Sequence, residues 1–234
     1  MAGIGIKLNK FFDKGTVTGY LAGSGYSVVT TIAPMLLVIA DILAMQKILG
    51  YSDAAYGSRQ LFQATILYIF VFALLASAPL NAVLSRYVSD VIFNETYSDI
   101  MAAFHLGLWI SMAIDAIMVV PFAIHEYIVG GVDIVYVVTS VCCFIALSLV
   151  FYTMLYLSLC KDYGKISLFY FIGMAITLGI SYIFVKKFNM EITYSMLLAM
   201  TIGFIIIASL GYALLRQYFT QNSKNYKDVL QYIV

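Results

Sequence analysis

Residues Ile134–Leu159 read IVYVVTSVCCFIALSLVFYTMLYLSL and contain no charged side chain. An α-helix rises about 1.5 Å per residue, so roughly 20 apolar residues cross the ~30 Å of hydrocarbon in a bilayer. Strands of membrane β-barrels alternate apolar and polar residues over about ten positions, whereas this run is continuously apolar and much longer. It therefore predicts a membrane-spanning helix.

Five more runs of this kind occupy most of the chain: Thr18–Ala44, Leu61–Leu84, Met101–Ile124, Ile166–Val185 and Tyr194–Leu215. Hydrophobic residues make up 63% of the sequence and charged residues 11%, which excludes a soluble globular protein. The loops between the runs are too short to fold into a separate domain. We predict an all-α, polytopic membrane bundle of six transmembrane helices over residues 16–216, with the lipid bilayer as its surroundings.

Both ends of the chain look different from the runs. Residues 1–15 place Ile4, Leu8, Phe11 and Phe12 on one side at helical spacing, which is typical of an amphipathic segment lying in the membrane interface. Residues 217–234 are largely polar and are expected to form a tail. We predict that both segments lie on the cytoplasmic side.

The basic residues give the orientation of the bundle. If the N-terminus is cytoplasmic, nine basic residues lie inside: Lys7, Lys10, Lys14, Arg86, Lys161, Lys165, Arg216, Lys224 and Lys227. Four then lie outside: Lys47, Arg59, Lys186 and Lys187. Because cytoplasmic loops carry an excess of Lys and Arg, this distribution predicts that both termini are cytoplasmic.

The first run gathers small and polar residues on one face. At about 100° per residue, six of them share a stripe about 80° wide: Gly19, Gly23, Ser27, Thr30, Pro34 and Asp41. Small residues at four-residue spacing let helices approach closely, so helix packing is the prediction for Gly19, Gly23 and Ser27. The far half of the stripe is a candidate substrate or ion pathway, in which Pro34 permits a bend. For Asp41 the alternative is an acid at the water interface.

Asp115 lies near the centre of the third run, where an ionised acid costs roughly 2.5–3.5 kcal/mol. Ser111, one turn earlier, is a candidate hydrogen-bond donor, and no basic residue lies at a similar depth in any run. The acid is therefore protonated or faces a polar cavity. We predict that it faces a transport pathway; the alternative is a structural hydrogen bond to a neighbouring helix.

Three other runs place polar side chains at helical spacing. In the second run, Ser77 and Asn81 flank Pro79, and Asn81 and Arg86 are candidate pathway residues at its cytoplasmic end. The fifth run repeats the small-residue pattern, for which we predict helix packing: Gly173, Thr177 and Ser181. The fourth offers Ser148, Tyr152 and Tyr156. Packing is expected there too, although interior tyrosine hydroxyls also suit a sugar pathway.

Signatures of enzymes and cofactor sites are missing from the sequence. It has no phosphate-cradling glycine loop, no helical pair of metal ligands and no Ser-His-acid set. Cys142 and Cys143 fall in the fourth run and Cys160 directly follows it; all three are expected to pack as small apolar residues. The net charge of +1 gives no sign of a nucleic-acid partner. We expect no catalysis, no metal and no cofactor.

The opening residues Met1–Phe12, MAGIGIKLNKFF, followed by Gly25-Tyr26 and Pro34, resemble the start of the Pel exopolysaccharide transport proteins, the PelG family. The stretch Ser85–Asp90, SRYVSD, is similar to the Arg-Tyr-x-x-Asp loop of that family. The resemblance implies the N-terminal lobe of a flippase of the multidrug, oligosaccharidyl-lipid and polysaccharide (MOP) superfamily. In such a carrier, two lobes of about six helices surround a cavity that opens alternately to each side.

On this resemblance, the chain would help to export an amino-sugar-containing exopolysaccharide across a bacterial inner membrane. The implied partners are a cytoplasmic glycosyltransferase, membrane scaffold subunits, and a second six-helix half or a homodimer partner. Asp115 and the stripe of the first run would be the first candidates for cavity residues. Two alternatives stay open: a non-transporting scaffold of a polysaccharide synthesis complex, and a six-helix small-solute carrier that acts as a dimer.

Overall fold

The computed structural model describes residues 17–94, 99–159 and 163–219. Within these ranges the chain is all-α, with six long helices, one 3-10 turn and no strand. The elements are α2 (Val17–Ile48), η1 (Tyr51–Asp53), α3 (Tyr56–Phe93), α4 (Asp99–Ile128), α5 (Ile134–Leu159), α6 (Tyr163–Phe188) and α7 (Ile192–Tyr218). The predicted interfacial segment 1–15 and almost all of the predicted tail lie outside the described residues.

Helices α3 to α7 are each long and apolar enough to cross a bilayer, which gives five candidate spans among the described residues. The protein is therefore a multi-pass membrane protein. The predicted sixth crossing belongs to α2, a helix of 32 residues, and it stays a prediction. The limits predicted for Ile134–Leu159 are those of α5, while the other helices extend a few residues beyond their apolar runs.

One predicted loop is wrong. The stretch Ser85–Asp90 belongs to α3, which continues to Phe93. No Gly or Pro interrupts this part of the helix, and three buried side chains continue the helical spacing: Leu84, Val88 and Val91. Arg86 therefore lies on the surface of a helix, about two turns before its end, and not in a connecting loop.

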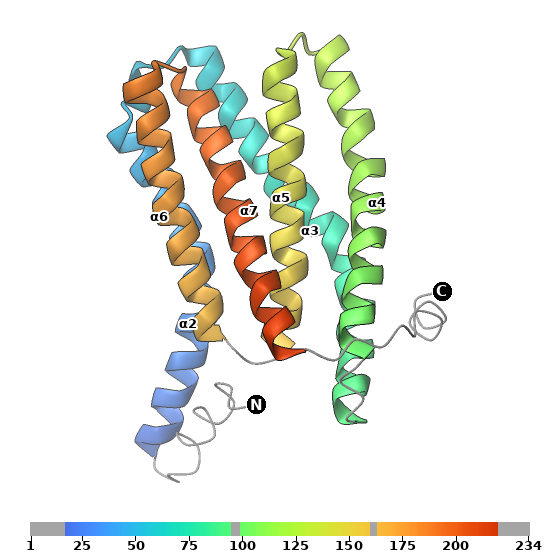
Figure 1. The fold of residues 1–234 in the computed structure, drawn as a ribbon. Coiled ribbons are helices and arrows are strands. Elements are labelled where there is room, and N and C mark those ends of the chain that lie inside the picture. Colours follow the sequence, from blue (N-terminus) through green and yellow to red (C-terminus); the bar gives the residue numbers. More distant parts are fainter. Residues whose placement is uncertain (1–16, 95–98, 160–162, 220–234) are drawn as a thin grey trace.

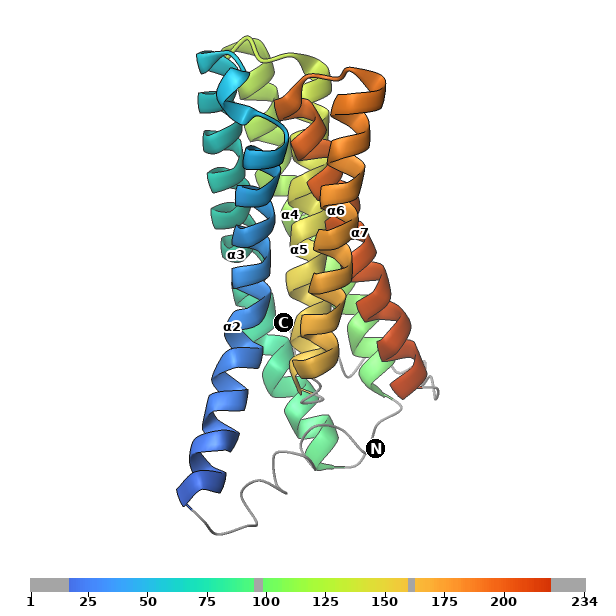
Figure 2. The ribbon, with the colours of Figure 1, turned by 90° about the vertical axis from the view of Figure 1, so that its left-hand side faces the viewer.

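Successive long helices alternate in direction, as Figure 1 shows: α2, α4 and α6 run one way, and α3, α5 and α7 run the other. α5 packs against α3, α4 and α7; α7 packs also on α6, and α6 on α2. α2 and α4 are consequently opposite flanks of the bundle (Figures 1 and 2). We call the end where α4 stops and α5 begins the upper end, as it stands in Figure 1.

α5 and α7 contribute many of the most deeply buried side chains, including Tyr152, Tyr156, Met196, Phe204 and Ile207. The outer faces of α3 and α4 instead expose large apolar side chains: Leu67, Leu74, Leu75, Trp109 and Ile117. A surface of this kind would promote aggregation in water, whereas hydrocarbon tails solvate it well. The pattern of burial thus agrees with a bundle that has lipid around it.

Small residues bring α6 and α7 together. A Cβ atom at Gly203 of α7 would collide with the Thr177 hydroxyl of α6, and one at Gly173 of α6 would collide with Ile207 of α7. The Thr177 hydroxyl donates to the Gly173 carbonyl oxygen (2.9 Å), so its polar group is satisfied inside its own helix. Absence of side-chain atoms at the two glycines is what allows this close approach, which we call the α6/α7 contact.

The connections at the upper end are held by tyrosine hydroxyls. Tyr51 of η1 donates to the Arg59 carbonyl oxygen (2.9 Å), and Tyr194 of α7 donates to Asp133, just before α5 (2.8 Å). Burial raises the pKa of Tyr51 from its ordinary value, and the positive charge of Arg59 opposes that shift. The Tyr51 hydroxyl therefore keeps its proton at neutral pH and remains a donor.

Candidate transport site

Asp115 is buried at the middle of α4, with 1% of its surface exposed. The Ser148 hydroxyl of α5 donates to its Oδ1 atom (3.0 Å), while its Oδ2 atom has no hydrogen-bond partner among the described residues. The sequence predicts Ser111 as the donor, whereas the bond that the structure shows comes from the neighbouring helix. Ser111 is buried one turn away on the same helix. A carboxyl group with one satisfied oxygen thus lies between two membrane-spanning helices.

Tyrosine hydroxyls continue the polar contacts between α4 and α5 toward the lower end. The Tyr152 hydroxyl, one turn beyond Ser148, donates to the Phe104 carbonyl oxygen of α4 (2.8 Å) and lies 3.3 Å from the Tyr156 hydroxyl. A Cβ atom at Gly107 would collide with the Tyr152 hydroxyl, so this glycine provides the space that the tyrosine needs. We call the region of Asp115, Ser148, Tyr152 and the Phe104 carbonyl group the α4/α5 contact.

A third helix joins these groups at the lower end. The Nε2 atom of His105 lies 3.2 Å from the Tyr212 hydroxyl of α7, and the ring of Tyr212 stacks on Phe104. The rings of Tyr152 and Tyr156 contact Phe104 from α5. Polar and aromatic groups from α4, α5 and α7 therefore run from the middle of the bundle to its lower end.

The structure does not bring Asp41 together with Asp115. Asp41 is buried on α2, which packs chiefly on α6, while Asp115 lies on the opposite flank. The Oδ2 atom of Asp41 has no hydrogen-bond partner among the described residues. Pro34 is half-buried inside α2, which continues through it. Of the remaining stripe residues only the helical backbone is described: Gly19, Gly23, Ser27 and Thr30.

The other predicted residues have mixed surroundings. Asn81 of α3 is half-buried, and its Oδ1 atom has no partner among the described residues, whereas Arg86 is exposed. Gly173, Thr177 and Ser181 lie on the buried face of α6. The Ser181 hydroxyl donates to the Leu178 carbonyl oxygen (2.9 Å). Four buried side-chain oxygen atoms thus lack a partner in the described part of the chain: those of Asp41, Asn81, Asp115 and Ser195.

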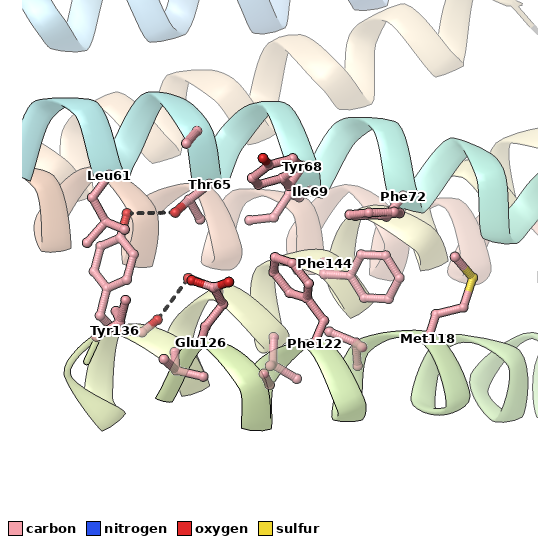
Figure 3. A pocket seen from close by; sticks show the side chains of 17 residues that line it. Leu61, Thr65, Tyr68, Ile69, Phe72, Met118, Phe122, Glu126, Tyr136 and Phe144 are labelled. Carbon is pink, nitrogen blue, oxygen red and sulfur yellow. Dashed lines mark hydrogen bonds between the residues drawn. The ribbon is translucent and has the colours of Figure 1, made fainter. Parts of the chain in front are cut away.

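A cavity of about 400 Å³ lies elsewhere, between α3, α4 and α5 at the upper end (Figure 3). Its walls contain none of the predicted pathway residues. They include Glu126, Tyr136 and Phe144. The sequence gives no sign of this cavity, because Glu126 lies just beyond the predicted end of the third run, where an acid is typical of an ordinary loop.

Metal-binding groups do not gather in the described ranges: no three His, Cys, Asp or Glu residues there could hold a metal ion. Cys142 is exposed and Cys143 is buried, and both are free thiols. Cys160 lies outside the described residues. The chemistry that the described interior offers is hydrogen bonding through hydroxyl, carboxyl and amide groups.

A family model with the description "PelG: Putative exopolysaccharide Exporter (EPS-E)" matches residues 1–234, the whole length of the chain. The chain belongs to this family. Membership in PelG agrees with the resemblance at Met1–Phe12 and suggests a transporter rather than an enzyme. No curated protein and no solved structure matches the chain.

Proposed function

We propose that this PelG-family protein supplies a six-helix lobe of an exporter for an amino-sugar-containing exopolysaccharide, and that Asp115 is a pathway residue. The observation on which this rests is the burial of Asp115 in mid-span with one of its carboxyl oxygens unsatisfied. A group of this kind is costly inside a membrane, so a functional role is the default explanation. Its single described partner, Ser148, is a neutral hydroxyl and does not compensate a full charge.

The α4/α5 contact is where we place the conformational change. It is held through side-chain hydrogen bonds, which a carboxyl or hydroxyl group can exchange for bonds to water or to a sugar. A shift of α4 along α5 would free Asp115 from Ser148 and open the polar groups between the helices. An acid uncovered in this way would attract the ammonium group of an amino sugar.

The remaining elements of the proposal concern topology and partners. α2 is the sixth crossing, both termini are cytoplasmic, residues 1–15 lie in the interface, and 217–234 form a cytoplasmic tail. A second six-helix half, or another copy of this chain, completes the carrier. A cytoplasmic glycosyltransferase and membrane scaffold subunits supply the polymer. The excess of basic residues on the assigned cytoplasmic side supports this orientation.

The test is Asp115→Asn, which keeps the size of the side chain and its ability to accept from Ser148 but removes the ionisable group. We expect surface polysaccharide to be lost, with unchanged abundance of the protein in the membrane. Asp53→Asn is the matched control, because Asp53 is an exposed acid of η1. Asp115→Glu should recover part of the export.

Undiminished export by Asp115→Asn would overturn the assigned role. Loss of the protein from the membrane would show a structural role for Asp115 instead. If Asp115→Asn exports normally but substitution of Gly19 and Gly23 by Leu prevents co-purification of the synthesis complex, the scaffold alternative is favoured.

A further inference from the structure

The cavity at the upper end is elongated along the helices. On α3 its lining runs from Leu61 to Phe72, a length of about 16 Å at 1.5 Å per residue. α4 and α5 form the other walls over similar stretches (Figure 3). Since these helices are candidate spans, the long axis of the cavity follows the direction of the lipid tails in a bilayer.

Polarity changes along this axis. Near the upper end the lining includes the Glu126 carboxyl group, and the Tyr136 hydroxyl, which donates to Thr65 (3.3 Å). At the deep end the walls are Phe72, Met118 and Phe144, as Figure 3 shows. The polar end therefore lies at the edge of the membrane and the apolar end inside it, which is how an amphiphile arranges itself in a bilayer.

The cavity is open to the surroundings of the bundle. Tyr68 and Phe122 both line it and expose 47% and 39% of their surface. The neighbouring surface of α3 exposes Leu67 and Val71. A hydrocarbon chain of the surrounding lipid can therefore enter sideways without crossing the interior of the bundle.

Charge indicates the headgroup of the occupant. Glu126 is the single ionisable carboxylate in the cavity lining, and no Lys or Arg lies among the described residues that form it. Glu126 is about one-third exposed, and its Oε1 atom lies 3.3 Å from Nδ1 of the more exposed His125. A cationic headgroup at this position would be attracted, and a purely anionic one would be repelled.

We propose that this cavity is a binding site for a phospholipid with an ammonium headgroup, of the phosphatidylethanolamine class. One acyl chain lies between Phe72, Met118 and Phe144, and the ammonium group pairs with Glu126. The volume of about 400 Å³ lies in the range of ordinary ligand pockets. This proposal requires that α3, α4 and α5 lie in a membrane, and it does not depend on the role of Asp115.

The test is native mass spectrometry of the natural protein, purified in mild detergent and titrated with phosphatidylethanolamine or phosphatidylglycerol of identical acyl chains. We expect one phosphatidylethanolamine to be retained preferentially. Glu126→Gln should weaken its binding about fivefold, the scale of one partly exposed charge pair. Glu191→Gln, which alters an exposed acid at the same end of the bundle and outside the cavity, should bind as the wild type does.

A second variant separates the site from lipid that binds generally to the outside. Ala123→Phe places a large ring inside the cavity, where Ala123 is half-buried, and should lower retention of both lipids. Each variant must show wild-type helix content and elution volume. Equal binding of phosphatidylethanolamine by the wild type and Glu126→Gln would overturn the proposal, as would retention that Ala123→Phe leaves unchanged.

Discussion

The α6/α7 and α4/α5 contacts join neighbouring helices of the same bundle by opposite means. At the α6/α7 contact, Gly203 leaves room for the side chain of Thr177, whose hydroxyl already forms a hydrogen bond within its own helix. At the α4/α5 contact, Asp115 and Tyr152 form hydrogen bonds across the gap. Close steric fit permits one arrangement, whereas hydrogen bonds can change partners. We therefore assign α6/α7 to the rigid part of the lobe and α4/α5 to the part that moves.

The largest effect should follow Gly203→Ala. The added methyl group would collide with the Thr177 hydroxyl, so Thr177 must rotate away from its bond to Gly173 or α6 and α7 must separate. Overpacking of a tight contact typically costs 1–3 kcal/mol, and we expect a loss of about 2 kcal/mol in the free energy of unfolding. Equilibrium unfolding from mixed micelles measures this change.

Gly179→Ala is the control for that substitution. A Cβ atom at Gly179 of α6 has nothing within 4 Å, so the variant should be as stable as the wild type or slightly more stable. Equal stability of the Gly203→Ala and Gly179→Ala variants would show that the α6/α7 contact adapts easily, and the comparison would fail.

A smaller effect on stability should follow Ser148→Ala. The change removes the hydrogen bond to Asp115 Oδ1 and leaves the acid without its described donor. Hydrogen bonds between membrane helices contribute about 0.6 kcal/mol on average and up to about 1.7, so we expect a loss of about 1 kcal/mol. Export should fall as well, because Asp115 is no longer oriented; surface polysaccharide per unit of protein measures this.

Ser158→Ala is the matched change on the same helix. The Ser158 hydroxyl donates to the Leu155 carbonyl oxygen within α5 (2.7 Å), so its loss leaves the α4/α5 contact intact. We expect normal export from this variant. If both serine variants export equally, Ser148 has no special relation to the pathway.

Helix positions followed from the sequence where apolar residues were continuous. Ile134–Leu159 gave the limits of α5 because apolar side chains alone decide where a helix leaves the hydrocarbon. The loop predicted at Ser85–Asp90 is wrong, because Arg86 and Asp90 are exposed residues on the surface of a helix that continues past them. A helix can continue beyond the membrane edge when the side chains on one of its faces remain buried, and those of Val88 and Val91 are buried.

The candidate site was only partly predictable. Asp115 stands out in the sequence because an acid in mid-span is unusual. The sequence of one helix cannot show which residue of another helix is its partner. Ser111 is the nearest donor along the chain, but Ser148 is the donor that lies beside Asp115 in space. Tyr152 and Tyr156 were visible through their spacing. Glu126 gave no signal, because its meaning depends on the cavity that α3 and α5 form beside it.

The most direct measurement compares the accessibility of one buried residue from each contact. In a chain whose Cys142, Cys143 and Cys160 are replaced by Ala, Ser111→Cys reports on the face of α4 that holds Asp115, and Thr177→Cys reports on the α6/α7 contact. Both positions are almost fully buried. In exporting cells, a charged methanethiosulfonate reagent should label Ser111→Cys and leave Thr177→Cys unlabelled. Equal labelling of the two positions, or none at either, would contradict the account.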